Sequence, residues 1–283
     1  MGLFDILRPE RLHIAWTYAT SGVIWRALPG PGETLVGEER DLDRKLVLFF
    51  CVDRKNGSVL WEKRGFDETW WIGIAGMCSD TLFLHSYATP ELPELKSITA
   101  VDLKTGKHLW ANREMHFLSA NDSALIAYRD TLFGREHCEL DPRTGEVRKT
   151  LQPGDIEENI PEKEVETRFP EPLEDTSIID GYCDLLKIEG PVGAIHVGDL
   201  LIFNILERSG VQRAAHEGVN NTLKVADRKR DRILFDDLLM SNAPAIAPES
   251  FFVQSDTLFY VKERNILTAV HLERRMRDHQ TGT

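Results

Sequence analysis

The sequence has few cysteines, and none of them stand close together. There are four in 283 residues, at Cys51, Cys78, Cys138 and Cys183, so no CxxC motif exists. Metal-binding and redox-active cysteine sites commonly depend on such close pairs, and the sequence lacks that signature. Because disulfides are rare in reducing compartments, we expect four free thiols in a cytoplasmic protein.

Long hydrophobic segments are also missing. No stretch approaches the roughly 20 apolar residues that a membrane-spanning helix requires. The opening segment, MGLFDILRPERLHIAW, is interrupted by Asp5, Arg8, Glu10 and Arg11. Such a segment has no continuous signal-peptide core. We therefore expect a protein that does not associate with membranes.

Positive charge is scarce relative to negative charge. The chain has 34 lysines and arginines against 46 acidic residues, which gives a net charge of -12. A field of this sign repels phosphate backbones and anionic lipids, so we expect no nucleic-acid partner. Hydrophobic residues make up 42% of the chain, enough to bury the core of one large domain or two small ones. We expect residues 1–283 to form a single domain.

A repeated ten-residue motif is the strongest positive signal. Its shared pattern is an apolar residue, Asp, any residue, Lys or Arg, Thr or Asn, and Gly. Asp can accept backbone N–H bonds within a turn, and Gly supplies the positive φ that closes a short loop. The motif therefore predicts a repeated strand–turn–strand unit. The copies are VDRKNGSVLW (52–61), VDLKTGKHLW (101–110), LDPRTGEVRK (140–149) and a weaker ADRKRDRILF (226–235).

The spacing of the motif predicts a β-propeller. The intervals between Asp53, Asp102, Asp141 and Asp227 are 49, 39 and 86 residues, the last being about two repeats. A further relative, LTAVH, places His271 44 residues after Asp227. A period of about 40–50 residues with several strands per unit is typical of propeller blades. We expect an all-β propeller of about five blades, with six as the alternative.

Three other segments complete this architecture. Residues 12–18 alternate like a single strand, and pairing them with the last blade, at 251–272, would close the ring and remove two sheet edges. Residues 152–176 are acidic and rich in proline, which predicts a surface excursion. If 152–189 instead holds a degenerate blade, the count is six. Residues 274–283 are expected to be a frayed tail.

The repeat resembles that of the PQQ-like, or quinoprotein-type, β-propellers. The copies at 52–61 and 101–110 match this pattern closely, including a final Trp. That Trp is expected to lie between neighbouring blades. The third copy has Lys149 in its place, and the fourth has Phe235. The later blades are therefore expected to be less regular.

The whole chain also resembles an uncharacterised family of short bacterial propeller proteins. The resemblance lies in GVIWRAL (22–28), EERDLDRKLVLFF (38–50) and WWIGI (70–74). It implies a fold and no known activity. Quinoprotein dehydrogenases are longer, have a calcium site and often carry an adjacent cysteine pair that is missing here. Because fold does not imply function, we expect no PQQ, no other cofactor and no metal.

Five residues are candidates for ligand binding: Glu39, Arg40, Trp70, Trp71 and His85. Glu39 and Arg40 lie in EERD, where Arg40 could bind a carboxylate or phosphate near the ring axis. The alternative is a solvated hairpin tip. Trp70 and Trp71 would face opposite sides of a strand, so one could bind a sugar, an aromatic ligand or a peptide. Alternatively, both pack between sheets. His85 lies in an apolar strand. It could act as a general base or a ligand in the central channel, or it could be a core residue.

The sequence contains no nucleophile elbow, P-loop or HExxH motif. We therefore expect a non-catalytic binding or scaffold module that presents a propeller face to a protein or a small molecule. The alternative is a hydrolase or lyase that acts on a carbohydrate-like substrate in the axial funnel. In that case Glu39, Arg40, Trp71 and His85 are the first candidates. Convergence of these side chains at one place would favour a ligand site.

Overall fold

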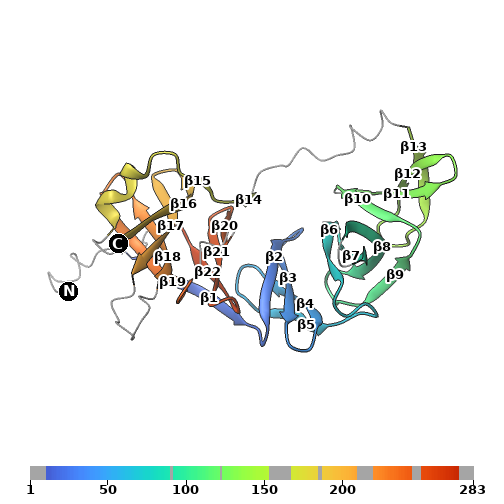
Figure 1. Ribbon diagram of the computed structural model, residues 1–283, viewed down its shortest axis with the longest axis horizontal. Helices are drawn as coiled ribbons and strands as arrows, with labels where there is room; N and C mark the ends of the chain where they lie inside the picture. The colour runs from blue at the N-terminus through green and yellow to red at the C-terminus, as the bar shows by residue number, and fades with distance from the viewer. Residues whose placement is uncertain are drawn as a thin grey trace, which may run out of the picture. The chain divides into compact units, whose positions relative to one another are not determined.

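The computed structural model forms two compact units (Figure 1). The three-sheet unit comes from the described part of Thr20–Val165, and the two-sheet unit from that of Met1–Ala19 with Glu166–Thr283. That residues 1–283 form one domain stays a prediction. No helix in the described ranges is long and apolar enough to cross a membrane. The described ranges are 11–89, 92–121, 123–152, 167–183, 187–208, 219–243 and 250–273.

The three-sheet unit consists of three antiparallel sheets, each made of four strands in chain order. The first contains β2 (Val23–Pro29), β3 (Thr34–Asp41), β4 (Leu46–Asp53) and β5 (Val59–Arg64). The second contains β6 (Ile72–Cys78), β7 (Thr81–Thr89), β8 (Leu92–Asp102) and β9 (His108–Asn112). The third contains β10 (His116–Ala120), β11 (Leu125–Thr131), β12 (Gly134–Leu140) and β13 (Val147–Leu151).

The two-sheet unit contains two five-stranded antiparallel sheets. One has the order β15 (Glu171–Pro172), β16 (Lys187–Val197), β17 (Leu200–Arg208), β18 (Val219–Asp227) and β19 (Arg232–Met240). The other has the order β1 (Ile14–Ala19), β22 (Ile266–His271), β21 (Thr257–Lys262), β20 (Phe251–Gln254) and β14 (Thr167–Arg168). Strand β1 pairs with β22, so the N-terminal strand joins the last sheet as the sequence predicts.

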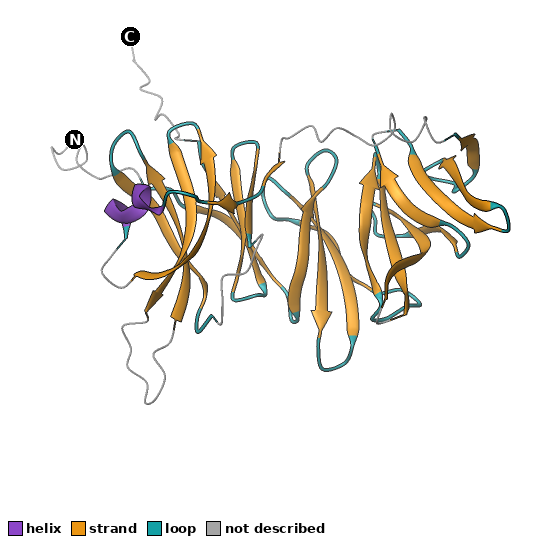
Figure 2. Ribbon diagram, turned by 45° about the horizontal axis from the view of Figure 1, so that its top comes forward, coloured by secondary structure: helices purple, strands orange, loops and turns teal. Residues whose placement is uncertain are grey.

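The prediction of an all-β chain with about five propeller-type sheets is confirmed (Figure 2). The described part of 152–189 adds no further sheet. It contains β14, β15 and the 3₁₀ helix η2 (Thr176–Tyr182), and its strands join the two existing sheets. Most of the predicted excursion, and the predicted tail at 274–283, lie outside the described residues.

The repeated motif forms the turn that its residues predict. In the second sheet, Asp102 Oδ1 accepts the Thr105 backbone N–H at 2.9 Å. The Asp102 carbonyl accepts the Gly106 N–H at 2.8 Å, and Gly106 has a φ of 67°. In the weaker fourth copy, Asp231 stands at the glycine position with a φ of 48°. Asp tolerates this conformation better than most residues, so the turn survives the loss of glycine.

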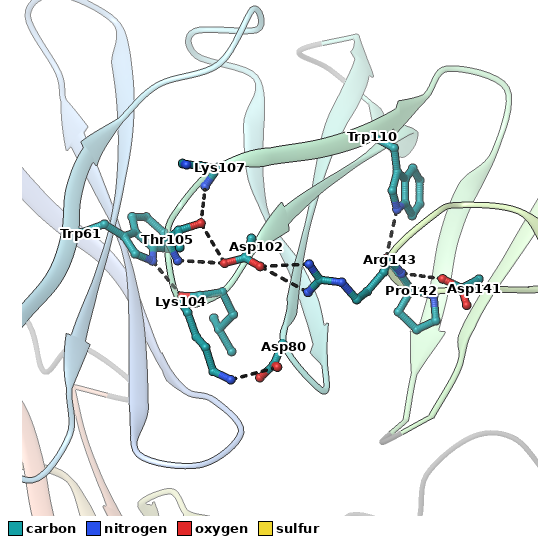
Figure 3. A network of polar contacts seen from close by, with 11 residues as sticks. Trp61, Asp80, Asp102, Lys104, Thr105, Lys107, Trp110, Asp141, Pro142 and Arg143 are labelled. Carbon is teal, nitrogen blue, oxygen red and sulfur yellow. Dashed lines mark hydrogen bonds and ion pairs between the residues drawn. The ribbon is translucent and has the colours of Figure 1, made fainter.

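A tryptophan at the end of one sheet packs on the turn of the next (Figure 3). The Trp61 indole lies on Gly106, where a Cβ would come within 2.7 Å of the ring. Its Nε1 donates to the Leu103 carbonyl at 2.8 Å. Trp110 lies on Gly145 of the third sheet in the same way. The predicted place of the tryptophan between neighbouring sheets is confirmed, and the glycine has a second role because its bare backbone receives the ring.

The same turns are also joined by charge. Arg143, in the third sheet's turn, donates from both Nη atoms to Asp102 Oδ2 of the second sheet's turn, each at 3.2 Å (Figure 3). Lys149, which replaces the tryptophan in the third copy, is exposed.

The apolar core of this unit lies between the sheets. Val36 and Phe49 of the first sheet, for example, share one buried cluster with Leu82 of the second.

Candidate functional site

Four of the five candidate residues gather where the first and second sheets of the three-sheet unit face each other. Arg40 comes from β3, Trp70 and Trp71 precede β6, and His85 lies on β7. Five further residues connect them by contacts described below. We call this set the Trp25–His85 face. Its members are Trp25, Arg26, Glu38, Arg40, Trp70, Trp71, Gly73, His85 and Tyr87.

Arg40 is held by bonds to both sheets. Its Nε donates to Glu38 Oε1 at 2.7 Å, and its Nη2 lies 2.6 Å from the same oxygen. Nη2 also donates to the Ile72 carbonyl at 3.1 Å. The guanidinium carbon lies 5.1 Å from the ring centroids of Trp25 and of Trp70. Arg40 therefore positions the two tryptophans and neutralises Glu38.

Glu39 does not join this face. Its Oε1 accepts the Gly22 backbone N–H at 2.6 Å. The neighbouring Glu38, which the sequence reasoning missed, is only 1% exposed, and its Oε2 accepts the Ile74 N–H at 3.3 Å. Residues two apart on a strand share a face. This alternation was the available signal, since it places Glu38 with Arg40 and Glu39 on the other side.

Trp70 and Trp71 lie in the bend before β6, and the alternation expected on a strand does not apply to them. Glu68 Oε1 accepts both of their backbone N–H groups, at 3.0 and 2.8 Å. Trp70 is half-buried against the core between the sheets, with Lys45 Nζ 4.8 Å from its ring centroid. Trp71 is 38% exposed. The bend therefore exposes Trp71 to solvent more than Trp70.

His85 is buried but has no hydrogen bond. It is 6% exposed, and neither ring nitrogen has a partner among the described residues. Its ring meets the edge of Tyr87 at a centroid distance of 4.9 Å. Burial, followed by the charges of Arg26 and Arg40, lowers the pKa of His85 to about 4. At neutral pH the ring is therefore uncharged, with one donor and one acceptor nitrogen.

Gly73 lies between Glu38 and His85. Gly73 and His85 are directly opposite on β6 and β7. A methyl group on Gly73 would lie 3.3 Å from Glu38 Oε2 and 3.7 Å from His85 Nε2. A glycine inside a strand often marks a place where a ligand approaches the backbone. An atom above Gly73 would meet the Glu38 carboxylate and the His85 ring together.

Trp25 and Arg26 complete the face from β2. The register of β2 against β3 shifts between Ile24 and Arg26. A bulge of this kind re-aims side chains and breaks strict alternation, which is why sequence reasoning missed this pair. Trp25 is 58% exposed, and Arg26 Nη1 donates to the Ile74 carbonyl at 3.0 Å.

The low pKa of His85 predicts a dependence of stability on pH. In the unfolded chain this histidine titrates near its ordinary value of 6.5, and in the folded chain near 4. The unfolded state binds more protons between these values, so stability is fully present above pH 6.5 and falls as the pH approaches 4. The whole shift corresponds to about 3 kcal/mol in the free energy of unfolding. Urea denaturation across this range measures it.

A His85→Phe variant is the control for this prediction. It keeps a ring against Tyr87 and has no titrating group, so its stability should change less between about pH 6.5 and 4. It should also be more stable than the wild type at neutral pH by about 1 kcal/mol, because a buried polar group without a partner is removed. Equal pH slopes in the two proteins would contradict the prediction.

A second candidate is a cleft of about 460 Å³ in the two-sheet unit, lined in part by Tyr182, Lys224 and Phe235. Its buried charge is already paired, because Lys224 Nζ lies 3.2 Å from Glu207 Oε1. In the Trp25–His85 face, both ring nitrogens of the buried His85 lack any polar partner within the part of the chain that the structure describes, and two exposed tryptophans lie nearby, so we regard it as the stronger site. No group of side chains in the described ranges has the composition of a metal site.

Comparison with known proteins gives a match over part of the chain and no activity. The model of a family described as "Domain of unknown function (DUF4905)" matches residues 31–110. This segment contains Glu38, Arg40, Gly73 and His85 of the site. No curated protein matches the sequence.

Many solved structures match at low similarity. BamB from Moraxella catarrhalis is 12% identical with a TM-score of 0.39, and the match covers 92% of this chain and 88% of that one. The β-propeller domain of the Trilobed protease from Pyrococcus furiosus is 11% identical with a TM-score of 0.30. That match covers 86% of this chain and 64% of the other. At this identity, ligands do not transfer between these proteins and the present chain.

Proposed function

We propose that this protein is a non-catalytic binding module that holds a small polar ligand on the Trp25–His85 face. The observation that carries the proposal is the buried His85, whose ring nitrogens have no partner among the described residues and which lies beside the side-chain-free backbone of Gly73. Leaving a buried polar group without a hydrogen bond costs about 1–3 kcal/mol. A ligand that bonds to His85 recovers this cost, so the site is arranged for an occupant.

The chemistry of the face favours binding over catalysis. A general acid or base works best when its pKa lies near the operating pH, and the pKa of His85 is about 4. The nearby carboxylate, Glu38, is already bonded to Arg40 at 2.7 Å. Both groups are therefore better suited to fixed hydrogen bonds than to proton transfer. The exposed rings of Trp25 and Trp71 add surface on which a ligand can pack.

The test is a thermal-shift screen of the whole protein with sugars, nucleotides, metals and quinones, followed by a Gly73→Ala variant. A ligand at one hundred times its Kd raises stability by about 2.7 kcal/mol, which corresponds to several degrees in Tm. In Gly73→Ala the new methyl lies between Glu38 and His85. We expect it to abolish the shift by blocking the approach of a ligand to His85, provided that Glu38 moves slightly to admit the methyl group; the stability of the free protein is measured alongside.

Gly65→Ala is the matched control. Gly65 is exposed, and its new Cβ would meet only ordinary contacts, the nearest being Leu48 at 3.5 Å. This variant should keep the full thermal shift. A shift that persists unchanged in Gly73→Ala and His85→Phe would place the ligand elsewhere. A screen without any hit would overturn the small-ligand proposal in favour of a protein partner.

A further inference from the structure

We infer that the ligand of the Trp25–His85 face is a hydroxylated small molecule that carries an anionic group. This inference rests on the proposed function and names the class of ligand. It follows from the charge left over on the face, from its exposed aromatic rings, and from the donors and acceptors around Gly73.

The charge that remains on the face after the Arg40–Glu38 ion pair is positive. The charge of Arg40 is met by Glu38 at 2.6 Å. Arg26, which is exposed, makes one side-chain hydrogen bond within the described part of the chain, and its acceptor is the uncharged Ile74 carbonyl. A guanidinium has five N–H donors in a planar fork suited to carboxylates and phosphates. Arg26 lies opposite Glu38 in the register of β2 and β3 but forms no ion pair in the described residues, so most of its donors are available for an anion.

This local positive charge is opposite in sign to the net charge of the chain, which is -12. Next to the face, Lys45 Nζ lies 4.8 Å from the Trp70 ring centroid, and the carboxylate of Glu68 accepts the Trp70 and Trp71 N–H groups. These two opposite charges leave Arg26 as the cation that decides the sign. An acidic protein repels small anions at long range, so a cationic face within it concentrates binding at one place. A neutral ligand could accept hydrogen bonds from Arg26 but would form no ion pair with it.

The polar groups around Gly73 suit a hydroxyl group. Glu38 Oε2 has a single long bond, of 3.3 Å, from the Ile74 N–H. A carboxylate oxygen accepts more than one hydrogen bond, and neutral His85 offers both a donor and an acceptor. A hydroxyl can donate to one group while accepting from the other. The exposed rings of Trp25 and Trp71 would then pack against the apolar parts of the ligand body.

The experiment is a titration of the whole protein with three probes, glucuronate, glucose 6-phosphate and glucose, followed by tryptophan fluorescence and calorimetry. We expect at least one of the two anions to bind at least tenfold more tightly than glucose. Raising NaCl from about 50 mM to about 500 mM should weaken only the anion, since salt screens exposed charges. The preferred anion then identifies the source as a sugar acid or a phosphate ester.

Arg26→Gln should remove the preference for the anion while leaving the free protein folded. Arg64→Gln is the matched control, because Arg64 is an exposed arginine at the end of β5 in the same sheet. It should keep the preference. An Arg26→Lys variant should retain part of it, since the charge remains while the fork is lost.

The results that overturn the inference are distinct from those that overturn the proposed function. Glucose binding as tightly as both anions, with loss of binding in Gly73→Ala, refutes the anionic class but keeps the site. Anion binding that is unaffected by Arg26→Gln refutes it as well. A third outcome is that none of the three probes binds, while a compound of another chemical class gives a thermal shift that Gly73→Ala abolishes. This outcome also refutes the inference, but the proposed binding function stands.

Discussion

Trp61→Ala is expected to lower the free energy of unfolding by about 3–5 kcal/mol, as truncation of a large buried aromatic side chain generally does. Trp61 is 5% exposed, and its indole lies on the backbone of Gly106 in the neighbouring sheet. The change removes this contact. It also removes the hydrogen bond from Trp61 Nε1 to the Leu103 carbonyl oxygen, which is 2.8 Å long. The measurement is urea denaturation followed by far-ultraviolet circular dichroism.

Two variants separate packing from hydrogen bonding in this contact. Trp61→Phe keeps an aromatic ring near Gly106 and loses the N–H donor together with the second ring of the indole, so it should cost less than Trp61→Ala. Trp25→Ala is the control for the loss of any tryptophan. Trp25 is 58% exposed, and its removal should change stability by about 0.5 kcal/mol or little more. If Trp61→Ala costs no more than Trp25→Ala, the indole does not join the sheets.

Glu38→Gln is expected to destabilise the protein by about 3 kcal/mol, the lower end of the range for breaking a buried ion pair. The side chain of Glu38 is 2% exposed and that of Arg40 is 11% exposed, with 2.6 Å between Glu38 Oε1 and Arg40 Nη2. The substitution preserves the shape of Glu38 but leaves the Arg40 charge without a counter-charge. Chemical denaturation at neutral pH gives the value.

A double variant shows whether this cost belongs to the pair. Glu38→Leu combined with Arg40→Met removes both charges and keeps much of the apolar volume, so it should be more stable than either single change. The difference from additivity measures the coupling between the two residues. Additive effects, or a cost below about 1 kcal/mol for Glu38→Gln, would show that water solvates Arg40 well enough to replace its partner.

Part of the binding face could be predicted from the sequence, and the rest could not. Arg40 and His85 were identifiable as polar residues next to or within apolar strands, and alternation places Glu38 beside Arg40. Trp25 and Arg26 could not be found by alternation, because β2 shifts register between Ile24 and Arg26. The bend that carries Trp70 and Trp71 also depends on Glu68, whose carboxylate accepts hydrogen bonds from the backbone N–H groups of both tryptophans.

The sequence by itself determined the turns and their spacing. The bonds of Asp102 to Thr105 and Gly106 lie within five residues, so local chemistry is enough to form them, and their recurrence indicates several similar sheets. Only the tertiary structure decided that Glu38, Gly73 and His85 meet, because they come from three strands in two sheets. Their contact depends on how one sheet packs against the next, and no local pattern specifies the depth or register of that packing.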